Sequence, residues 1–380
     1  MSNLIKLCML LCQCGYKFKM ALVKLNLSDF RNIKNASIQP AAGINIILGE
    51  NGSGKSSVLE AIHYLGLGRS FRTHLTSRVV QHGEKDFTLF SQCQQFLNDE
   101  QITTIGLKKS KNSDTELKIA GQKAERLAEL PGILPLQLIH PESFTLLSSG
   151  PKLRRQFVDW GVFHVEPEFF ATWAKLTRLL KQRNAILKSG KRYAELAYWD
   201  KEFAVQGTII AQMRRRYLEQ LNPIIKSALA DFLPEYDFDI RYHPGWDSDI
   251  ELTELLKQNF MRDQQLGYTS LGPQKADIRI RANGVPAHDI LSRGQLKLAV
   301  CAMRLSQGLF LSQHSNKRCT FLIDDFSSEL DVSKRKLLAQ YLIESKAQVF
   351  VTAIEKSQVA ALLTESCKMF HVEHGKLTEF

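Results

Sequence analysis

The stretch Gly49-Glu50-Asn51-Gly52-Ser53-Gly54-Lys55-Ser56 has the spacing of a phosphate-binding loop. The apolar run Ile44-Asn45-Ile46-Ile47-Leu48 before it predicts a strand, and Ser57-Val58-Leu59-Glu60-Ala61-Ile62 after it predicts a helix. Strand, glycine loop and helix follow one another in the order that such a loop requires. The stretch therefore predicts an α/β fold that binds a nucleoside triphosphate at this loop.

Each residue type in this loop suits the binding of phosphate. The glycines let the backbone turn its N–H groups inward, and the N-terminus of the following helix adds a favourable dipole. Lys55 is expected to reach the β- and γ-phosphates and to act in catalysis, and the Ser56 hydroxyl to hold Mg²⁺. The residues expected to contact the nucleotide are Gly49, Glu50, Asn51, Gly52, Ser53, Gly54, Lys55, Ser56 and Ser57.

The composition indicates a globular protein with a basic surplus. Of the 380 residues, 44% are hydrophobic, which is enough for a sizeable core in two or three domains. Lys and Arg exceed Asp and Glu by 11, which favours a polyanionic partner. The seven cysteines form no CxxC pair, so neither a disulfide framework nor a zinc site is indicated. No stretch approaches transmembrane length, so we expect a soluble protein without a membrane partner.

Residues 1–19 differ in character from the rest of the chain. Regular alternation of apolar and polar residues begins only after Met20, which predicts that 1–19 is an unordered extension or that Met20 is the true initiator. Cys8, Cys12 and Cys14 have the right chemistry for metal ligands, but no second ligand cluster accompanies them.

Residues 22–27 and 36–38 predict an antiparallel start to the sheet that includes 44–48. Arg31 lies in the loop between the first two strands. It either contacts the nucleotide or pairs with Asp29 on the surface.

Three further segments belong to the same part of the chain. Residues 66–72 supply two arginines beside an aromatic residue and either touch phosphate or form a solvated turn. Residues 86–120 carry short runs typical of hairpins, and 136–140 predict another buried strand.

Between Lys152 and Leu233 the apolar residues recur at helical spacing, which predicts two long helices joined near Ser189-Gly190. Residues 151–220 hold fourteen Lys and Arg against seven Asp and Glu. Their basic clusters form either a solvated helical face or a face that follows DNA phosphates. The candidate DNA contacts are Arg154, Arg155, Lys191, Arg192, Arg214, Arg215 and Arg216, and Lys181-Gln182-Arg183 is a further cluster.

A second half of the nucleotide site is expected far along the chain. Thr320-Phe321-Leu322-Ile323 predicts a strand that ends in Asp324 and Asp325. Asp324 is expected to hold Mg²⁺, directly or through water. Asp325 is expected to orient the attacking water or accept its proton.

An apolar helix is expected to begin at the stretch Leu291-Ser292-Arg293-Gly294-Gln295. This stretch resembles the LSGGQ signature of ATP-binding-cassette ATPases, with Arg293 in place of a glycine. The resemblance implies that Ser292, Gly294 and Gln295 contact ATP held by a second subunit. Ser327-Ser328-Glu329-Leu330-Asp331 resembles the loop that lines the dimer interface there. Thr352 lies near the position at which many such ATPases carry a switch histidine.

About 270 residues, including a helical arm, separate the glycine loop from the acids, which resembles the heads of chromosome-maintenance ATPases. With the other motifs, the chain from Met20 onwards closely resembles the RecF family of bacterial recombination mediators. Gln274 stands where that family usually has His, and residues 1–19 have no counterpart. The motifs that carry the likeness are residues 27–32, 66–72, 154–159, 272–277 and 292–295.

The resemblance implies an α/β head of the ATP-binding-cassette type, with a mixed sheet and an inserted, mainly helical arm domain. The expected organisation is an extension at 1–19, the N-terminal part of the head at 20–150, the arm at 151–270 and the C-terminal part of the head at 271–380. Slow, DNA-stimulated ATP hydrolysis is implied, because Asp325 is one methylene shorter than the Glu common at this position.

The implied function is that of a cytoplasmic ATP-dependent homodimer that clamps duplex DNA at single-strand gaps. Such proteins work with RecO and RecR to load RecA in replication restart, repair and the SOS response. The competing interpretation is a cassette-type ATPase with another output, linked either to a nuclease or to a transporter.

Overall fold

The computed structural model describes residues 22–94, 102–112, 114–315, 317–327, 330–365 and 367–380. The extension at 1–19 and its three cysteines lie outside these residues. The chain divides into two compact units, one ending at Ser143 and resuming at Cys301, the other running from Phe144 to Val300. This division differs from the expected boundaries at 150/151 and 270/271, because residues 144–150 and 271–300 join the second unit.

Strands occur in both units. The strands are β1 (Leu22–Phe30), β2 (Ile33–Ile38), β3 (Ile44–Leu48), β4 (Asp86–Gln94), β5 (Ile102–Ser110), β6 (Thr115–Ile119), β7 (Gln122–Lys123), β8 (Leu136–Ile139), β9 (Phe238–His243), β10 (Asp277–Ala282), β11 (Val285–Pro286), β12 (Thr320–Ile323), β13 (Gln348–Ala353), β14 (Lys368–Glu373) and β15 (Lys376–Glu379).

The helices range from single turns to forty residues. The α-helices are α2 (Lys55–Leu67), α3 (Leu130–Ile133), α4 (Thr145–Ser148), α5 (Pro151–Val165), α6 (Phe169–Lys188), α7 (Tyr193–Phe232), α8 (Leu252–Gln258), α9 (Phe260–Leu266), α10 (Ala287–Ile290), α11 (Arg293–His314) and α12 (Val332–Glu344), and the 3-10 helices are η1 (Thr76–Arg78), η2 (Leu127–Glu129), η3 (Pro141–Phe144), η4 (Pro273–Lys275) and η5 (Lys356–Leu362).

The first unit contains two six-stranded sheets. One has the order β2-β1-β4-β5-β6-β7 and is antiparallel throughout, which confirms the expected hairpins. The other has the order β15-β14-β3-β13-β12-β8. The expectation that β1 and β2 share a sheet with β3 is wrong. All five residues of β3 are buried, as is typical of a strand between parallel neighbours, whereas β1 mixes buried and part-exposed positions.

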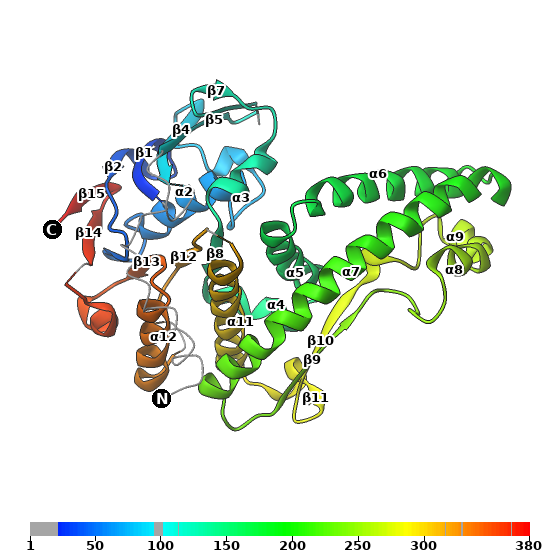
Figure 1. Cartoon of the computed structure of the whole chain (residues 1–380). Coiled ribbons are helices and arrows are strands. Elements are labelled where there is room, and N and C mark those ends of the chain that lie inside the picture. The colour runs from blue at the N-terminus through cyan, green and yellow to red at the C-terminus, as the bar shows by residue number, and fades with distance from the viewer. Residues whose placement is uncertain (1–21, 95–101, 113, 316, 328–329, 366) are drawn as a thin grey trace. The chain divides into compact units, whose positions relative to one another are not determined.

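Helix α2 lies between these two sheets (Figure 1), and residues 57–66 are all buried. Its Val58, Leu59 and Ile62 share one core with Leu25 of β1 and Phe350 of β13. A largely apolar helix with so many buried residues is stable only when it is enclosed in this way. The segment directly after the glycine loop is therefore fixed from both sides.

The parallel strands of the second sheet set the position of the candidate site. β12 pairs in parallel with β8 and β13, and β13 pairs in parallel with β3. Because the carboxyl ends of parallel strands meet at one edge of a sheet, the segments that follow β3, β8 and β12 converge there.

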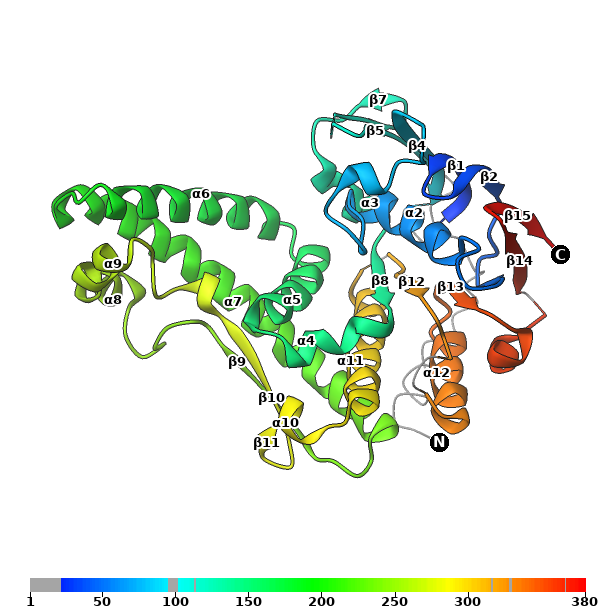
Figure 2. The ribbon, with the colours of Figure 1, turned by 180° about the vertical axis from the view of Figure 1, so that it is seen from behind.

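In the second unit α6 and α7 run side by side, as both views show (Figures 1 and 2). Their break at residues 189–192 confirms the junction expected near Ser189-Gly190. The prediction of only two helices is wrong, because α5 forms a separate helix that ends at Val165. The chain then leaves helical geometry before α6 begins at Phe169.

Arg183 of α6 is buried rather than solvated or facing phosphate. It donates from Nε to Asp200 of α7 and from Nη1 to Asp263 of α9, each at 2.7 Å. All three side chains have an exposed fraction of zero. This ion-paired group joins three helices, so the interpretation of 181–183 as a surface cluster is wrong for Arg183.

The second unit also contains a three-stranded sheet of order β11-β10-β9. β10 pairs antiparallel with β9 from Asp277 opposite His243 to Ala282 opposite Phe238. This pairing accounts for the inclusion of residues 271–300 in the second unit. Within the described part of the chain, no helix is both long and apolar enough to cross a membrane.

Candidate functional site

The glycine loop turns between β3 and α2 in the manner expected from its sequence. Gly49 has φ of 154°, and a Cβ added there would lie 2.3 Å from the carbonyl oxygen of Val372. Gly54, the residue before α2, has φ of 123°. Only glycine adopts such backbone conformations without strain, so the loop depends on both residues.

Lys55 begins α2 and faces the loop. Its Nζ donates to the carbonyl oxygens of Gly49 at 2.7 Å and Glu50 at 2.8 Å. Burial lowers the pKa of this ammonium group, while the nearby carboxylates of Asp324 and Asp325 act in the opposite direction. The ammonium group thus lies between the glycine loop and the acids that end β12.

Asp324 brings the two halves of the site together. Its Oδ1 accepts hydrogen bonds from Ser56 Oγ at 2.9 Å and from Thr352 Oγ1 at 2.8 Å. Hydroxyl and carboxylate oxygens are the hard ligands that Mg²⁺ prefers, and Mg²⁺ commonly uses one or two carboxylates together with substrate phosphates. Ser56 and Asp324 therefore fit the metal role that was expected of them.

Thr352 has a positioning role that the sequence did not reveal. Besides donating to Asp324, its hydroxyl accepts the backbone N–H of Asp325 at 2.8 Å. Asp325 has φ of 55°, a left-handed conformation that Asp adopts more readily than most residues. One hydroxyl on β13 thus holds both acids at the end of β12.

A cleft of about 830 Å³ opens at this edge of the sheet. Ser77, Arg78, His82 and Lys111 line it and were not predicted from the sequence. The lining residues are Arg31, Asn32, Asn51, Gly52, Gly54, Lys55, Ser56, Ser57, Arg72, Ser77, Arg78, Val80, His82, Lys111, Pro141, Asp324, Asp325, Thr352, Ala353 and Ile354.

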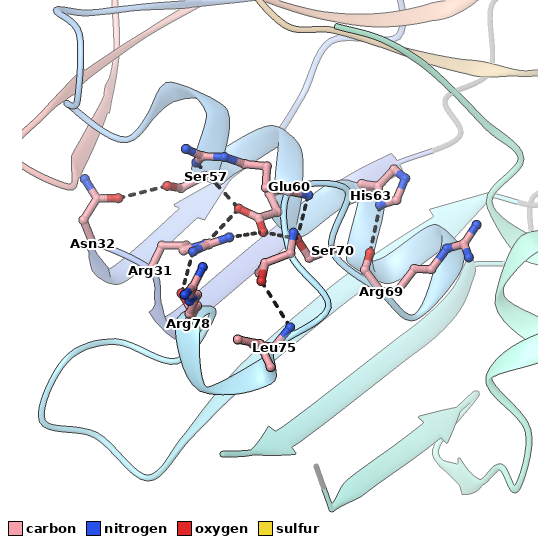
Figure 3. A network of polar contacts seen from close by, with 11 residues as sticks. Arg31, Asn32, Ser57, Glu60, His63, Arg69, Ser70, Leu75 and Arg78 are labelled. Atoms are coloured by element: carbon pink, nitrogen blue, oxygen red, sulfur yellow. Dashed lines mark hydrogen bonds and ion pairs between the residues drawn. The ribbon is translucent and has the colours of Figure 1, made fainter. Parts of the chain in front are cut away.

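The buried carboxylate of Glu60 on α2 holds Arg31, which lines the cleft (Figure 3). Arg72, which also lines the cleft, lies near the same carboxylate. Arg31 donates to it from Nε at 2.9 Å and Nη2 at 2.7 Å, and Arg72 Nη1 lies 3.8 Å away. Ser70 Oγ also donates to Glu60. Arg31 thus pairs with Glu60 rather than Asp29, and 66–72 is more than a solvated turn.

Glu60 could have been recognised in the sequence. An acid in the middle of an otherwise apolar helix requires a cationic or hydrogen-bonding partner when it is buried. Its neighbours Leu59 and Ala61 are both fully buried. The arginines on either side of α2 in the sequence were the available partners.

The sequence leaves open whether Gln137, His140 or Glu142 senses the γ-phosphate of a bound nucleotide. The structure gives Gln137 other partners. Gln137 is 1% exposed, donates to Gln307 at 2.9 Å and accepts from Arg304 at 2.7 Å. Its amide is therefore committed to the interior of the first unit.

The signature residues belong to the second unit and form the start of α11. The Ser292 N–H donates to Gln295 Oε1 at 2.9 Å, and the Gln295 N–H donates to Ser292 Oγ at 3.3 Å. This reciprocal capping box satisfies two N–H groups at a helix N-terminus. Ser292 is exposed and Gly294 half-buried. Ser328 and Glu329 of the loop compared with the dimer interface lie outside the described residues.

The expected DNA contacts on the arm divide into structural and exposed residues. Arg214 is buried and bidentate to Asp159 at 2.7 and 2.9 Å, so its assignment to DNA is wrong. Arg154 is likewise bidentate to Asp277, at 2.7 and 3.0 Å. These guanidinium groups are satisfied within the second unit.

The remaining candidate DNA contacts on the arm differ in whether another group of the chain pairs with them. Arg155 donates to the Ala276 carbonyl at 2.7 Å. Lys191 pairs with Glu195 and Arg216 with Glu166, both on the surface. Arg192 and Arg215 are exposed.

Comparison with known proteins decides the family. The family model described as the RecF/RecN/SMC N-terminal domain matches residues 21–378. The DNA replication and repair protein RecF of Psychromonas ingrahamii is 52% identical over 360 residues, which cover 94% of this chain and 99% of that protein. The chain belongs to the RecF family. RecF of Vibrio campbellii is 51% identical, with 94% and 100% covered.

Solved structures agree with the RecF assignment. The structure of the recombination mediator protein RecF-ATP in the RecFOR pathway has a TM-score of 0.85 at 25% identity and covers 97% of this chain and 99% of that one. An Smc head bound to the C-winged helix domain of ScpA has a TM-score of 0.61 at 17% identity, with 95% and 97% covered. These matches confirm the predicted ATP-binding-cassette type of α/β head.

Proposed function

We propose that this chain is an ATP-binding protein of DNA replication and recombinational repair, with weak, DNA-stimulated ATPase activity. The observation that carries the proposal is the junction of the two halves of the site, where Ser56 donates to Asp324 at 2.9 Å across 268 residues of sequence. The relationship to proteins named for DNA replication and repair, and to a RecF-ATP structure, supports it.

ATP binding is assigned to the glycine loop and Lys55. The loop N–H groups and the N-terminus of α2 provide donors for the phosphates. The Lys55 ammonium exchanges its two carbonyl acceptors for oxygens of the β- and γ-phosphates. Arg31, held by Glu60, stands in the lining of the same cleft and is assigned to the nucleotide.

Hydrolysis is assigned to the acids at the end of β12. When bound, Mg²⁺ neutralises charge on the β- and γ-phosphates. Ser56 and Asp324 would hold it, and Thr352 orients Asp324. Asp325 orients the attacking water and accepts its proton. Its short side chain reaches less far than Glu, which supports slow turnover.

The proposed output is an ATP-dependent homodimer that clamps duplex DNA at single-strand gaps in the cytoplasm. One copy supplies the glycine loop, and Ser292, Gly294 and Gln295 of the other supply a helix N-terminus for the γ-phosphate. ATP closes the clamp, and slow hydrolysis releases it. In this proposal the dimer acts with RecR and RecO in the loading of RecA, in replication restart and in SOS induction.

Retention on gapped duplex DNA with ATP, ADP or no nucleotide tests this function. We expect retention with ATP, little with ADP, and prolonged retention of Asp325→Asn with ATP because its hydrolysis is blocked. Equal retention with ATP and ADP would contradict the switch. Cleavage of the duplex in the presence of Mg²⁺ would favour the nuclease-linked alternative.

A further inference from the structure

One face of the three-stranded sheet in the second unit carries arginines that the packing of this unit does not use. Along β10, Ile278, Ile280 and Ala282 are buried, whereas Arg279 and Arg281 are exposed. Because successive residues of a strand point to opposite faces, both arginines project from one face. The isoleucines cover the core, and the arginines cover the outside.

The neighbouring strand adds a third arginine to that outer face. Arg241 of β9 lies directly opposite Arg279, and its side chain is 79% exposed. Like charges directly opposite each other destabilise a strand pair, so the fold does not benefit from this arrangement. A role outside the fold is therefore the better explanation of the pair.

The acids on this face offset only part of the charge of the three arginines. Asp239 pairs with Arg241 at 2.7 Å and lies directly opposite Arg281, so it offsets one of the three positive charges. Asp277 is already bidentate to Arg154 of α5. The face therefore keeps a positive surplus.

The arginines also border a concave site. A cavity of about 270 Å³ lies beside β10. The ionisable residues in its lining are Arg154, Asp277, Arg279, Arg281 and His288.

We propose that Arg241, Arg279 and Arg281, the arginine face, bind the backbone phosphates of duplex DNA. This inference rests on the proposed DNA-binding function. It assigns DNA binding to residues that are not among the basic clusters predicted at 151–220. Residues two apart on a strand are about 6.8 Å apart. Phosphates of one DNA strand advance about 3.4 Å per nucleotide along the duplex axis and also wind around it, so neighbouring phosphates are farther apart than this rise and suit the spacing of Arg279 and Arg281.

The chemistry of the side chain favours phosphate as the ligand. A guanidinium group stays charged at every physiological pH and presents a fork of donors to two phosphate oxygens. The regular spacing on a strand suits a ligand with regularly spaced charges. The arginine face therefore tracks the DNA backbone and does not read its sequence.

The test measures the affinity of the full chain with ATP for a fluorescent duplex, by anisotropy, over a range of salt concentrations. For the double variant Arg279→Ala, Arg281→Ala we expect at least a tenfold weaker affinity at low salt. The plot of log affinity against log salt should become shallower by about 1.8, because each neutralised phosphate contributes about 0.9.

Two further variants separate charge from fold and position. Arg279→Lys, Arg281→Lys keeps both charges and should keep most of the salt slope. Lys257→Ala, Arg262→Ala removes two exposed charges from α8 and α9 and should leave the slope unchanged. All variants should bind a fluorescent ATP analogue as the wild type does, because the glycine loop is untouched.

The outcomes separate this inference from the function on which it rests. If the wild type binds duplex with a steep salt slope and the double alanine variant keeps that slope, the arginine face does not bind DNA and the proposed function stands. If the wild type fails to bind duplex in any nucleotide state, both are overturned.

Discussion

Lys55 donates to two backbone carbonyls of its own loop, so its ammonium is held in place by partners that ATP can replace. Removing the side chain removes the charge that we assign to the β- and γ-phosphates. For Lys55→Ala we expect at least a tenfold loss of ATP affinity, which corresponds to about 1.4 kcal/mol. Titration with a fluorescent ATP analogue measures this effect. Lys118→Ala, which removes an exposed charge from β6, is the control. An unchanged affinity of Lys55→Ala would refute the assignment of the loop.

His63 on α2 makes the stability of the protein depend on pH. Burial lowers its pKa from 6.5 to about 4, and its Nδ1 donates to the Arg69 carbonyl at 2.8 Å. A carbonyl can only accept, so the neutral ring carries its proton on Nδ1. The unfolded chain takes up a proton near pH 6.5 and the folded chain only near pH 4. Stability is therefore present above about pH 6.5 and is lost as the pH falls through this window.

Replacing His63 should remove this dependence. His63→Asn keeps a donor near the position of Nδ1 but does not titrate. Urea unfolding at pH 7.5 and pH 5 should show that the wild type loses about 2 kcal/mol more than the variant between these conditions. Equal losses in the two proteins would show that His63 does not cause the effect.

For single residues, the sequence predicted the positions in the site of those side chains whose roles depend on local motif spacing. Lys55, Ser56 and Asp324 lie together as their motifs required. Thr352 and Glu60 could not be assigned from spacing alone, because their partners come from distant parts of the chain. The motif predicts which groups contact phosphate, whereas the groups that hold these side chains in place are set by tertiary packing.

Arg214 links three helical elements of the second unit through its hydrogen bonds. It joins α7 to Asp159 of α5 and donates to the Pro273 carbonyl of η4 at 2.8 Å. Arg214→Ala would leave a carboxylate and a carbonyl without their partner, so we expect a loss of about 3 kcal/mol in the free energy of unfolding. The adjacent, exposed Arg215 is a matched control, and Arg215→Ala should change stability by less than about 0.5 kcal/mol.

Tryptophan fluorescence in urea measures this prediction, because all four tryptophans lie between Phe144 and Val300. If Arg214→Ala is as stable as Arg215→Ala, the ion pair with Asp159 does not hold the elements together. The comparison also matters for DNA binding. A combined replacement of residues 214–216 would mix unfolding with the loss of exposed charge.

For single elements, the periodicity of the sequence predicted whether a segment is a helix or a strand better than it predicted which strands share a sheet. The break between α6 and α7 was read from Ser189-Gly190, and the strand β12 from its apolar run. The division into two sheets was missed, because α2 separates strands that are neighbours in sequence. Burial of Arg183 and Arg214 was missed because a basic cluster looks the same in sequence whether or not carboxylates enclose it.

For the whole molecule, the proposed composite site predicts a variant that binds ATP but stays single. Ser292 caps the N-terminus of α11 and belongs to the second unit, far in sequence from the glycine loop. Ser292→Arg places a bulky cation at the helix N-terminus that is assigned to the partner's γ-phosphate. We expect nearly unchanged ATP affinity and at least a tenfold weaker ATP-dependent dimer, measured by sedimentation. A variant that dimerises as well as the wild type would rule out this role for the signature.

The association state of the whole protein tests most directly the proposal that two copies of this chain enclose each ATP. Sedimentation velocity of the purified wild type, with and without saturating Mg-ATP, measures the association state. We predict a single chain without nucleotide and a dimer with Mg-ATP, stabilised further by gapped duplex DNA. A protein that remains a single chain under saturating Mg-ATP, with or without DNA, would contradict it.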